Sequence, residues 1–276
     1  MKTRRRALGQ HFLRDARLLE KIARTIDPQP ADVVIEIGPG KGALTRALSP
    51  LAGKVVAVEM DRILAEALDA DKPENVTVVE GDALVVSFER LITEIAGAGA
   101  RPPVKIIGNL PYAISGPFLA RVWEKRRLFS RASFLIQREV AERIAAGPGS
   151  KEFAPLSIML QVYFDVKILF RVAPGSFVPP PKVDSAVVSL VRRETPLIAL
   201  ADEAGFRKFL GSAFSQRRKT LLNNLAAMDV PAEKGRAALA SLGLVRTVRP
   251  EQVAIAAWAG LFAALRPADS PSLSRK

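Results

Sequence analysis

Cysteine is absent from this 276-residue chain, and histidine occurs only once. Without cysteine the protein has no disulfide framework, no thiol nucleophile and no cysteine-based metal site. The lone histidine, His11, argues against a protein metal centre, because such centres combine several imidazole, thiolate or carboxylate ligands. The sequence therefore predicts a reduced protein whose chemistry does not use a metal.

Long apolar runs are also lacking. The longest nearly apolar stretch, residues 253–265, is shorter than the ~20 residues that a helix needs to cross a bilayer. The Lys/Arg-rich start is not followed by an apolar core, as it would be in a secretory signal. We therefore expect a cytoplasmic protein with no membrane partner.

Positive charge is abundant, with a formal net charge of +13 and a pI of about 10.4. Arg4, Arg5 and Arg6 open the chain, and Arg14 and Arg17 follow. A second basic region contains Arg192, Arg193, Arg207, Lys208, Arg217, Arg218 and Lys219. Basic clusters on both sides of the central region indicate a phosphate-binding surface for a nucleic acid. A solvated helix face is the alternative for the second cluster.

Apolar runs alternate with helical segments in the first two thirds of the chain, which is typical of a parallel α/β sheet. The strand-like runs are residues 33–37, 55–59, 76–80, 104–107 and 133–136. Two later runs, 166–172 and 186–191, lie close together, so one of them should join the sheet antiparallel.

Pro196 marks a change to helical pattern, with one apolar stripe made by Phe206, Phe209, Leu210, Ala213 and Phe214 and continued by Leu221, Leu222 and Leu225. We therefore predict one domain over residues 1–195 and a helical domain over 196–276. A Ser/Pro-rich tail from about residue 267 is predicted to be disordered.

A glycine-rich turn joins the first strand to a helix in the segment Glu36-Ile-Gly38-Pro-Gly40. Glycines at these positions let the backbone approach a ligand. Glu59 and Asp82 end the next two strands, where carboxylates can bind ribose hydroxyls and an adenine amine; capping of the following helices is the alternative. Gly38-x-Gly40-x-x-Ala43 also fits a dinucleotide fingerprint. Nothing nearby suits hydride transfer, however, and Glu36 favours a cationic ligand over a pyrophosphate.

The segment Asn109-Leu110-Pro111-Tyr112 follows the fourth strand-like run. An amide, a rigid turn and an aromatic ring can together hold a planar amine. The Asn oxygen and the neighbouring carbonyl would accept hydrogen bonds from the amine, and the Tyr ring would stack on the base. The alternative is a β-turn in which Asn and Pro serve only the backbone.

The order of these motifs resembles that of the ribosomal RNA adenine dimethyltransferases. The motifs are Leu8-Gly-Gln-His-Phe-Leu13, Glu36-Ile-Gly-Pro-Gly40, Val58-Glu-Met-Asp61, Gly81-Asp82, Asn109-Leu-Pro-Tyr112, Gln137-Arg-Glu-Val140 and Phe177-Val-Pro-Pro-Pro-Lys-Val-Asp-Ser-Ala-Val-Val188. The resemblance spans about residues 7–190 and continues more weakly through 216–221. The proline-rich motif and Asn-Leu-Pro-Tyr are more similar to the small-subunit branch than to the macrolide-resistance branch that methylates large-subunit rRNA. His11 stands where many members carry Asn.

This resemblance implies a Rossmann-like, seven-stranded class I methyltransferase sheet with a small all-helical C-terminal domain. It implies methyl transfer from S-adenosylmethionine to the N6 of two adjacent adenosines in small-subunit rRNA, within a pre-ribosomal particle, by a monomer. The alternatives are a large-subunit enzyme and a non-catalytic nucleic-acid-binding relative. No metal and no strong general base is needed, since the proton can leave to water after transfer.

The resemblance also implies roles for individual residues. Asn109, Leu110, Pro111 and Tyr112 would be catalytic, and Tyr112 and Phe177 would stack on the target base; an anchor for its loop is the alternative role for Phe177. The implied cofactor-binding residues are Gln10, His11, Leu13, Glu36, Gly38, Gly40, Glu59, Met60, Asp82, Ala83 and Asn109. The implied RNA-binding residues are Arg4, Arg5, Arg6, Arg217, Arg218 and Lys219.

Overall fold

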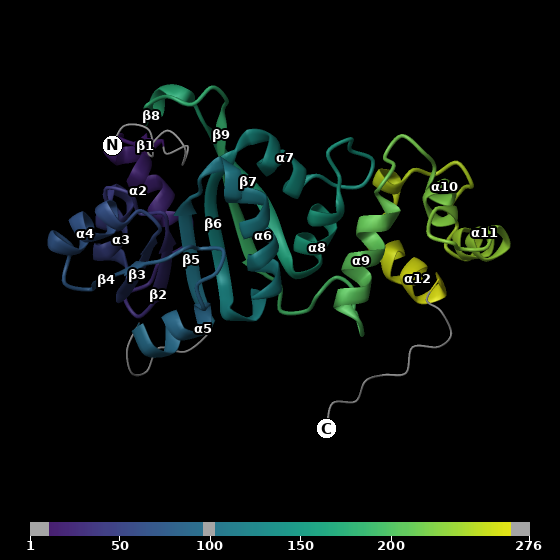
Figure 1. Ribbon diagram of the computed structural model, residues 1–276, viewed down its shortest axis with the longest axis horizontal. Coiled ribbons are helices and arrows are strands. Elements are labelled where there is room, and N and C mark those ends of the chain that lie inside the picture. The colour runs from purple at the N-terminus through teal and green to yellow at the C-terminus, as the bar shows by residue number, and fades with distance from the viewer. Residues whose placement is uncertain (1–10, 96–102, 266–276) are drawn as a thin grey trace. The chain divides into compact units, whose positions relative to one another are not determined.

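The computed structural model describes residues 11–95 and 103–265 (Figure 1). By its internal contacts the chain divides into two units, one formed by residues 1–145 and 163–194 and the other by residues 146–162 and 195–276. The segment 146–162, which the sequence division places in the first domain, thus groups with the C-terminal helices. Backbone hydrogen bonds from Leu197 to Val162 (2.9 Å) and from Gly149 to Glu251 (2.8 Å) hold it there.

The first unit is built on a seven-stranded sheet with the strand order β4-β3-β2-β5-β6-β9-β7. Strand β9 pairs antiparallel with both of its neighbours, and the other pairings are parallel. The predicted α/β sheet with one antiparallel late strand is therefore confirmed. The strands are β2 (Val33–Ile37), β3 (Lys54–Glu59), β4 (Val76–Glu80), β5 (Val104–Asn109), β6 (Phe129–Gln137), β7 (Phe164–Val172) and β9 (Ser185–Arg192).

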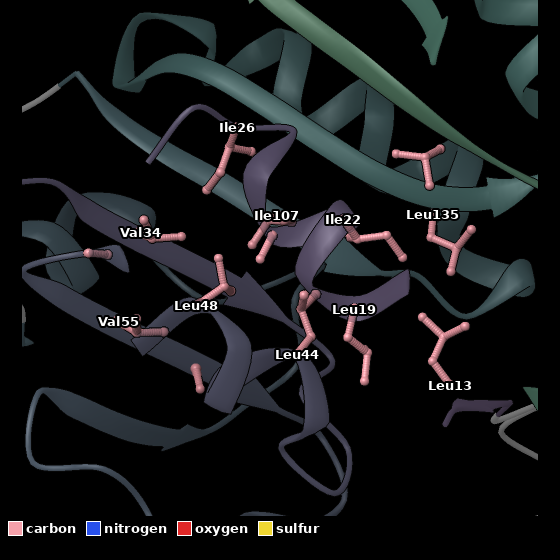
Figure 2. Close-up of a cluster of buried hydrophobic side chains, with 14 of the residues drawn as sticks. Leu13, Leu19, Ile22, Ile26, Val34, Leu44, Leu48, Val55, Ile107 and Leu135 are labelled. Atoms are coloured by element: carbon pink, nitrogen blue, oxygen red, sulfur yellow. The ribbon is translucent and has the colours of Figure 1, made fainter. Parts of the chain in front are cut away.

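Helices α2 (Ala16–Arg24) and α3 (Ala43–Leu48) pack on one face of this sheet (Figure 2). Helix α2 begins where the Asp15 carboxylate accepts hydrogen bonds from the backbone N–H groups of Arg17 and Leu18, which satisfies donors left open at the helix start. Leu19 and Ile22 then face the sheet, as Figure 2 shows, and belong to the same buried cluster as Leu44. Burial of apolar surface there, at about 25 cal/mol per Å², anchors both helices beside the glycine turn.

An aromatic cluster covers the opposite face. Side chains alternate along a strand, so Phe134 of β6 points away from its neighbour Leu135, which lies in the first cluster. Phe118 of α6 (Ser115–Glu124) packs edge-on against Phe134 with ring centroids 5.5 Å apart. Phe88 of α5 (Phe88–Arg90) packs edge-on against both Phe118 and Phe129. The sheet is therefore buried on both faces, as its continuous runs of Val and Ile require.

Shorter elements complete this unit. Strands β1 (Phe12–Leu13) and β8 (Phe177–Val178) form a separate two-stranded antiparallel sheet. The remaining helices are α4 (Arg62–Ala70) and α7 (Arg138–Ala145), with a π-helical turn at Leu91–Ile95 and 3-10 turns at Ser49–Leu51, Tyr112–Ile114, Arg126–Leu128 and Pro174–Ser176.

The described part of the second unit contains helices and no strand. Phe206, Phe209, Leu210 and Ala213 are buried on α9 (Glu203–Ala213), which confirms the predicted apolar stripe. Phe209 and Phe214 both contact the fully buried ring of Trp258 on α12 (Ile255–Leu265). The other helices are α8 (Pro155–Tyr163), α10 (Leu221–Ala226) and α11 (Ala232–Ser241), with a 3-10 turn at Pro250–Gln252. None of the helices in the described ranges is long and apolar enough to cross a membrane.

Candidate functional site

Three glycines shape the turn that follows β2. Gly38, Gly40 and Gly42 have φ values of +67°, +58° and +76°, which side chains of other residues rarely permit. A Cβ atom on Gly40 would come within 2.8 Å of the Phe12 ring, so only glycine fits beneath this ring. The turn thus brings bare backbone to the carboxyl edge of the sheet, where ligands of open α/β folds bind.

Glu59, the last residue of β3, holds this turn in place. One carboxylate oxygen accepts the Gly40 backbone N–H over 2.9 Å, and the other accepts the Asp61 backbone N–H over 2.9 Å. The side chain is only 4% exposed, and burial raises the pKa of Glu59 above its ordinary value. Since each carboxylate oxygen can accept more than one hydrogen bond, acceptor capacity remains for ligand hydroxyls.

Glu36 lies one strand away and is almost completely buried at 1% exposure. Burial raises the pKa of Glu36 to about 8, and the nearby negative charge of Glu59 acts in the same direction. Its Oε2 atom has no hydrogen-bond partner. A buried carboxyl group with an unmet acceptor is a favourable partner for a cationic group on a ligand.

The Asn109-Leu-Pro-Tyr112 turn begins at the last residue of β5. Leu110 is buried, and its N–H donates to the carbonyl oxygen of Leu135 on β6 (3.1 Å), which fixes the turn against the sheet. The Tyr112 hydroxyl bonds to Ser185 Oγ at 2.8 Å, and burial raises the pKa of Tyr112. The Asn109 side-chain amide donates to the carbonyl oxygen of His11 over 2.9 Å.

The His11 ring lies close to both aromatic residues that the sequence assigns to base stacking. Its centroid is 5.5 Å from that of Tyr112, with the planes tilted by 32°, and 6.4 Å from that of Phe177, edge-on. His11 Nδ1 donates to the carbonyl oxygen of Pro179 over 2.7 Å. Phe177 is only 2% exposed and pairs with Leu13 between β8 and β1. Because the Phe177 ring is buried, a base could stack on it only after its surroundings, which include the His11 ring, changed conformation.

Two adjoining cavities lie at this edge of the sheet, with volumes of about 50 and 170 Å³. Both are lined by Phe12, Gly38 and Asn109. The smaller cavity is also lined by His11, Gly40, Glu59, Leu110, Pro111 and Tyr112, and the larger one by Leu13, Glu36 and Lys41, among others. The structure therefore brings all four candidate catalytic residues and seven of the eleven candidate cofactor residues to one place.

Met60, Asp82, Ala83 and Phe177 do not line either cavity. Met60 is 59% exposed, next to Glu59 at the end of β3. Asp82 follows β4, the strand beside β3, and its carboxylate accepts the Leu84 N–H at 2.8 Å. Gln10 and Arg4, Arg5 and Arg6 lie outside the described residues, as does the tail from residue 267.

Arg121 is a residue that the sequence reasoning missed. From α6 its guanidinium donates to the carbonyl oxygens of Ala83 and Val86, and it lies over the Phe88 ring with 4.5 Å to the centroid. Burial lowers the pKa of Arg121. The side chain thus fixes the loop that carries Asp82 and Ala83. An isolated Arg in an apolar helix gives no sequence signal for a contact with a loop so far away along the chain.

Of the second basic region, Arg217, Arg218 and Lys219 lie in the connection between α9 and α10, whereas Arg207 and Lys208 lie on α9. Arg192 ends β9 and Arg193 follows it. Arg217 donates to the carbonyl oxygens of Lys151 and Phe153 in the same unit. Arg218 and Lys219 are exposed and form no ion pair with a carboxylate in the described ranges. The same ranges contain no group of three or more His, Cys, Asp or Glu side chains placed to hold a metal ion.

The residues at this edge fit a cationic, nucleoside-containing ligand. The unpartnered Glu36 oxygen suits an ammonium or sulfonium group, the glycine turn permits close approach, and Glu59 supplies acceptors. Asn109 adds amide groups beside these residues.

Comparisons with known proteins place the chain among rRNA methyltransferases. A family model described as "Ribosomal RNA adenine dimethylase" matches residues 1–264. The chain is 43% identical over 261 residues to Ribosomal RNA small subunit methyltransferase A of Geobacter sulfurreducens, covering 93% of each chain. It is 45% identical over 231 residues to the protein of the same name from Pelotomaculum thermopropionicum, covering 81% of this chain and 77% of that one.

Two solved structures are similar over most of their length. A dimethyladenosine transferase from Plasmodium falciparum aligns with a TM-score of 0.73 and 27% identity, covering 91% of this chain and 96% of that one. The 23S rRNA methyltransferase ErmE aligns with a TM-score of 0.70 and 28% identity, covering 92% and 99%.

Proposed function

The chain belongs to the ribosomal RNA adenine dimethylase family, and on this premise we propose that the cavities beside Gly38 and Asn109 form its active site. The protein is a methyltransferase that dimethylates adenosine in small-subunit rRNA. The observation that supports the location is the position of the Asn109-Leu-Pro-Tyr112 turn, which lines the same cavity as the glycine turn and Glu59.

S-adenosylmethionine, the methyl donor that the family implies, supplies an electrophilic methyl group when bound. Glu36 would face its cationic methionine end, because its carboxyl group is buried beside the glycine turn and Oε2 is unpartnered. Glu59 would accept the ribose hydroxyls, and Asp82 would accept the adenine amine. Met60 and Ala83 would flank the adenine, while Gln10, His11 and Leu13 would close the pocket from the N-terminal side.

Asn109 would act on the target amine. An adenine amine is a poor nucleophile, because its lone pair delocalises into the ring. Acceptance of its hydrogens by Asn109 Oδ1 and the Leu110 carbonyl oxygen would favour a tetrahedral nitrogen, whose lone pair can then point at the methyl group. Pro111 would keep these two acceptors at a fixed spacing. Holding the two reactants in line can contribute roughly 7–11 kcal/mol.

Tyr112 and Phe177 would hold the extruded base by stacking, which is worth about 1–3 kcal/mol per base. In the structure the His11 imidazole lies close to both rings. Stacking of the base on Tyr112 and Phe177 would therefore involve the segment around His11. No general base is needed, since the proton can leave to water after transfer.

The test of this function is to map modified adenosines in small-subunit rRNA that has been treated with the protein and S-adenosylmethionine. We expect N6,N6-dimethyladenosine at two adjacent positions. Modification of large-subunit rRNA alone would support the second candidate, which the similarity to ErmE favours. Cofactor binding without any modification would support a non-catalytic relative.

The cofactor residues have their own test. Glu59→Ala and Asp82→Ala should each weaken S-adenosylmethionine binding, since a hydrogen bond to a charged group is worth about 1.5–3 kcal/mol. Unchanged affinity of both folded variants in calorimetry would contradict the assignment.

Four further statements are predictions from the sequence: that the enzyme works as a monomer, in the cytoplasm, without a metal and on a pre-ribosomal particle. So is RNA binding by Arg4, Arg5 and Arg6 and by Arg217, Arg218 and Lys219.

A further inference from the structure

One face of the first helix carries a row of cations. Arg14 lies directly before Asp15, the N-cap of α2, and Arg17, Lys21 and Arg24 follow at spacings that place these three on the same side of the helix. All four are exposed, whereas Leu19, Ile22 and Ala23 on the other side of α2 are buried against the sheet. We call these four residues the α2 cation row.

The row lacks the carboxylate partners that ten other cations of this unit possess. Elsewhere Arg46 pairs with Asp71 at 2.7 Å and Arg138 with Asp184 at 3.3 Å. No member of the α2 cation row forms an ion pair with a carboxylate in residues 11–95 or 103–265. Lys21 is the one member in contact with a ring, since its ammonium lies 3.9 Å from the Phe170 centroid. Glu20 lies on the same side of the helix, three residues after Arg17 and four before Arg24, and forms no ion pair in the described ranges. Four cations against this one carboxylate still create a local positive field.

The row begins at the candidate active site. Arg14 lines the larger cavity together with Phe12, Leu13 and Lys41. From there the row extends along the helix for roughly 15 Å, at 1.5 Å of rise per residue. A chain of regularly spaced anions could thus lie along α2 with one end at the cavity mouth.

We propose that the α2 cation row binds the phosphates of the rRNA strand that flanks the target adenosine. This inference rests on the proposed function, because it takes the adenosine to enter at Asn109 and Tyr112. An extruded base stays joined to its neighbours, so their phosphates must run close to the cavity mouth. The row offers guanidinium and ammonium groups, and the Phe170 ring beside it lies under the Lys21 ammonium, so the row would contact phosphates and not base edges.

The experiment compares two double variants with equal loss of charge. Arg17→Gln/Arg24→Gln removes two cations from the row. Lys54→Gln/Arg127→Gln removes two cations from the amino edge of the sheet, where Lys54 begins β3 and Arg127 lies in the 3-10 turn before β6. Binding to a small-subunit particle is measured by filter retention across a salt series, with S-adenosylmethionine affinity measured in parallel. Circular dichroism and melting confirm that each variant is folded.

We expect the row variant to bind the particle roughly tenfold more weakly at 0.1 M salt. The slope of log binding constant against log salt concentration should fall in magnitude by about 1.4–1.8, because each lost phosphate contact removes about 0.7–0.9. The control variant should keep the parent slope, and cofactor affinity should be unchanged in both. If both variants lose the same amount, or if neither does, the row is only part of the net charge or a solvated face, and the proposal is wrong. Should the double variant fail to fold, the single variants Arg17→Gln and Arg24→Gln each carry the test with half the expected change.

Failure of the proposed function has a different signature. In that case the parent protein would not methylate small-subunit rRNA, whatever its salt slope. A parent that methylates this rRNA and a row variant with the parent slope would contradict only the role of the row.

Discussion

The side-chain amide of Asn109 donates a hydrogen bond to the carbonyl oxygen of His11 over 2.9 Å. This bond joins the turn at the end of β5 to the segment that forms β1. It also orients the planar amide, because the nitrogen is engaged by His11 and the oxygen is left as the acceptor. The same residue would therefore connect the closing segment of the site to the group that aligns the target amine.

Asn109→Ala should lower single-turnover methyl transfer by about 10²-fold or more, the loss typical of removing one aligned transition-state hydrogen bond. Cofactor affinity should change much less, since Glu36, the glycine turn and Glu59 remain. Rapid-quench measurement of the first turnover, with calorimetry of S-adenosylmethionine, separates the two effects. Transfer at the parent rate would show that Asn109 does not act on the amine.

Arg121→Met should weaken S-adenosylmethionine binding by roughly tenfold. The substitution removes the donors that hold the Ala83 and Val86 carbonyl oxygens, so the Asp82 loop loses its anchor. Since Arg121 lies away from the reacting groups, KM for the cofactor should rise while kcat at saturation stays near the parent value. Arg127→Met, an exposed arginine with no such contacts, is the matched control. A fall in kcat with unchanged KM would contradict this role.

The sequence predicted the parts of the site that follow from local pattern. A run of β-branched residues ending in Glu36-Ile-Gly38-Pro-Gly40 specifies a buried strand and a glycine turn, and parallel strands bring their carboxyl ends to one edge. Glu59 and Asn109, at the ends of β3 and β5, are therefore found beside this turn. The part of the small cavity formed by the glycine turn, Glu59 and the Asn109-Leu-Pro-Tyr112 turn was thus accessible to reasoning from strand ends, whereas Phe12 was not.

Contacts between distant segments were not accessible in this way. The pairing of β1 with β8 depends on two-residue strands that are too short for a periodic signal. The bonds from Arg121 to the Asp82 loop, and from Arg217 to residues 151 and 153, join long side chains to backbone carbonyls. Such bonds leave no pattern in the sequence, because any exposed-looking Arg could form them. The association of segment 146–162 with the C-terminal helices also depends on contacts between residues far apart in the sequence, such as the backbone bonds from Leu197 to Val162 and from Gly149 to Glu251.

The buried Glu36 should make stability depend on pH. Its pKa of about 8 in the folded protein lies above the ordinary value of 4.5, so the folded state binds this proton more tightly than the unfolded state does. The unfolding free energy should therefore fall as pH rises from 4.5 to 8, by at most about 1.4 kcal/mol per pH unit from this group. Urea unfolding of the parent and of Glu36→Gln at several pH values tests this. The parent should show the steeper decline, and identical profiles would contradict it.

Cofactor binding should have the opposite pH dependence. A cationic ligand beside Glu36 favours the carboxylate and lowers its pKa, so the proton is released on binding. S-adenosylmethionine affinity should then increase between pH 6 and 8 in the parent and change less in Glu36→Gln. Calorimetry in two buffers of different ionisation enthalpy counts the released proton directly. No released proton at pH 7 would place the cationic group away from Glu36.

RNA binding by the connection between α9 and α10 can be tested at Arg217, Arg218 and Lys219. The bonds of Arg217 to the carbonyl oxygens of Lys151 and Phe153 give it a structural role, whereas Arg218 and Lys219 are exposed. Alanine at all three positions should reduce rRNA binding and flatten its salt slope, but it should also lower the melting temperature.

The double variant Arg218→Gln/Lys219→Gln separates the effect on RNA binding from the effect on stability. This double variant should lose about 1.4–1.8 of slope if both side chains contact phosphates, with stability and S-adenosylmethionine affinity unchanged. Arg217→Ala alone should lower the melting temperature. A double variant that keeps the parent slope would leave this connection without an RNA role, and any loss in the triple variant would then be due to the missing Arg217 bonds.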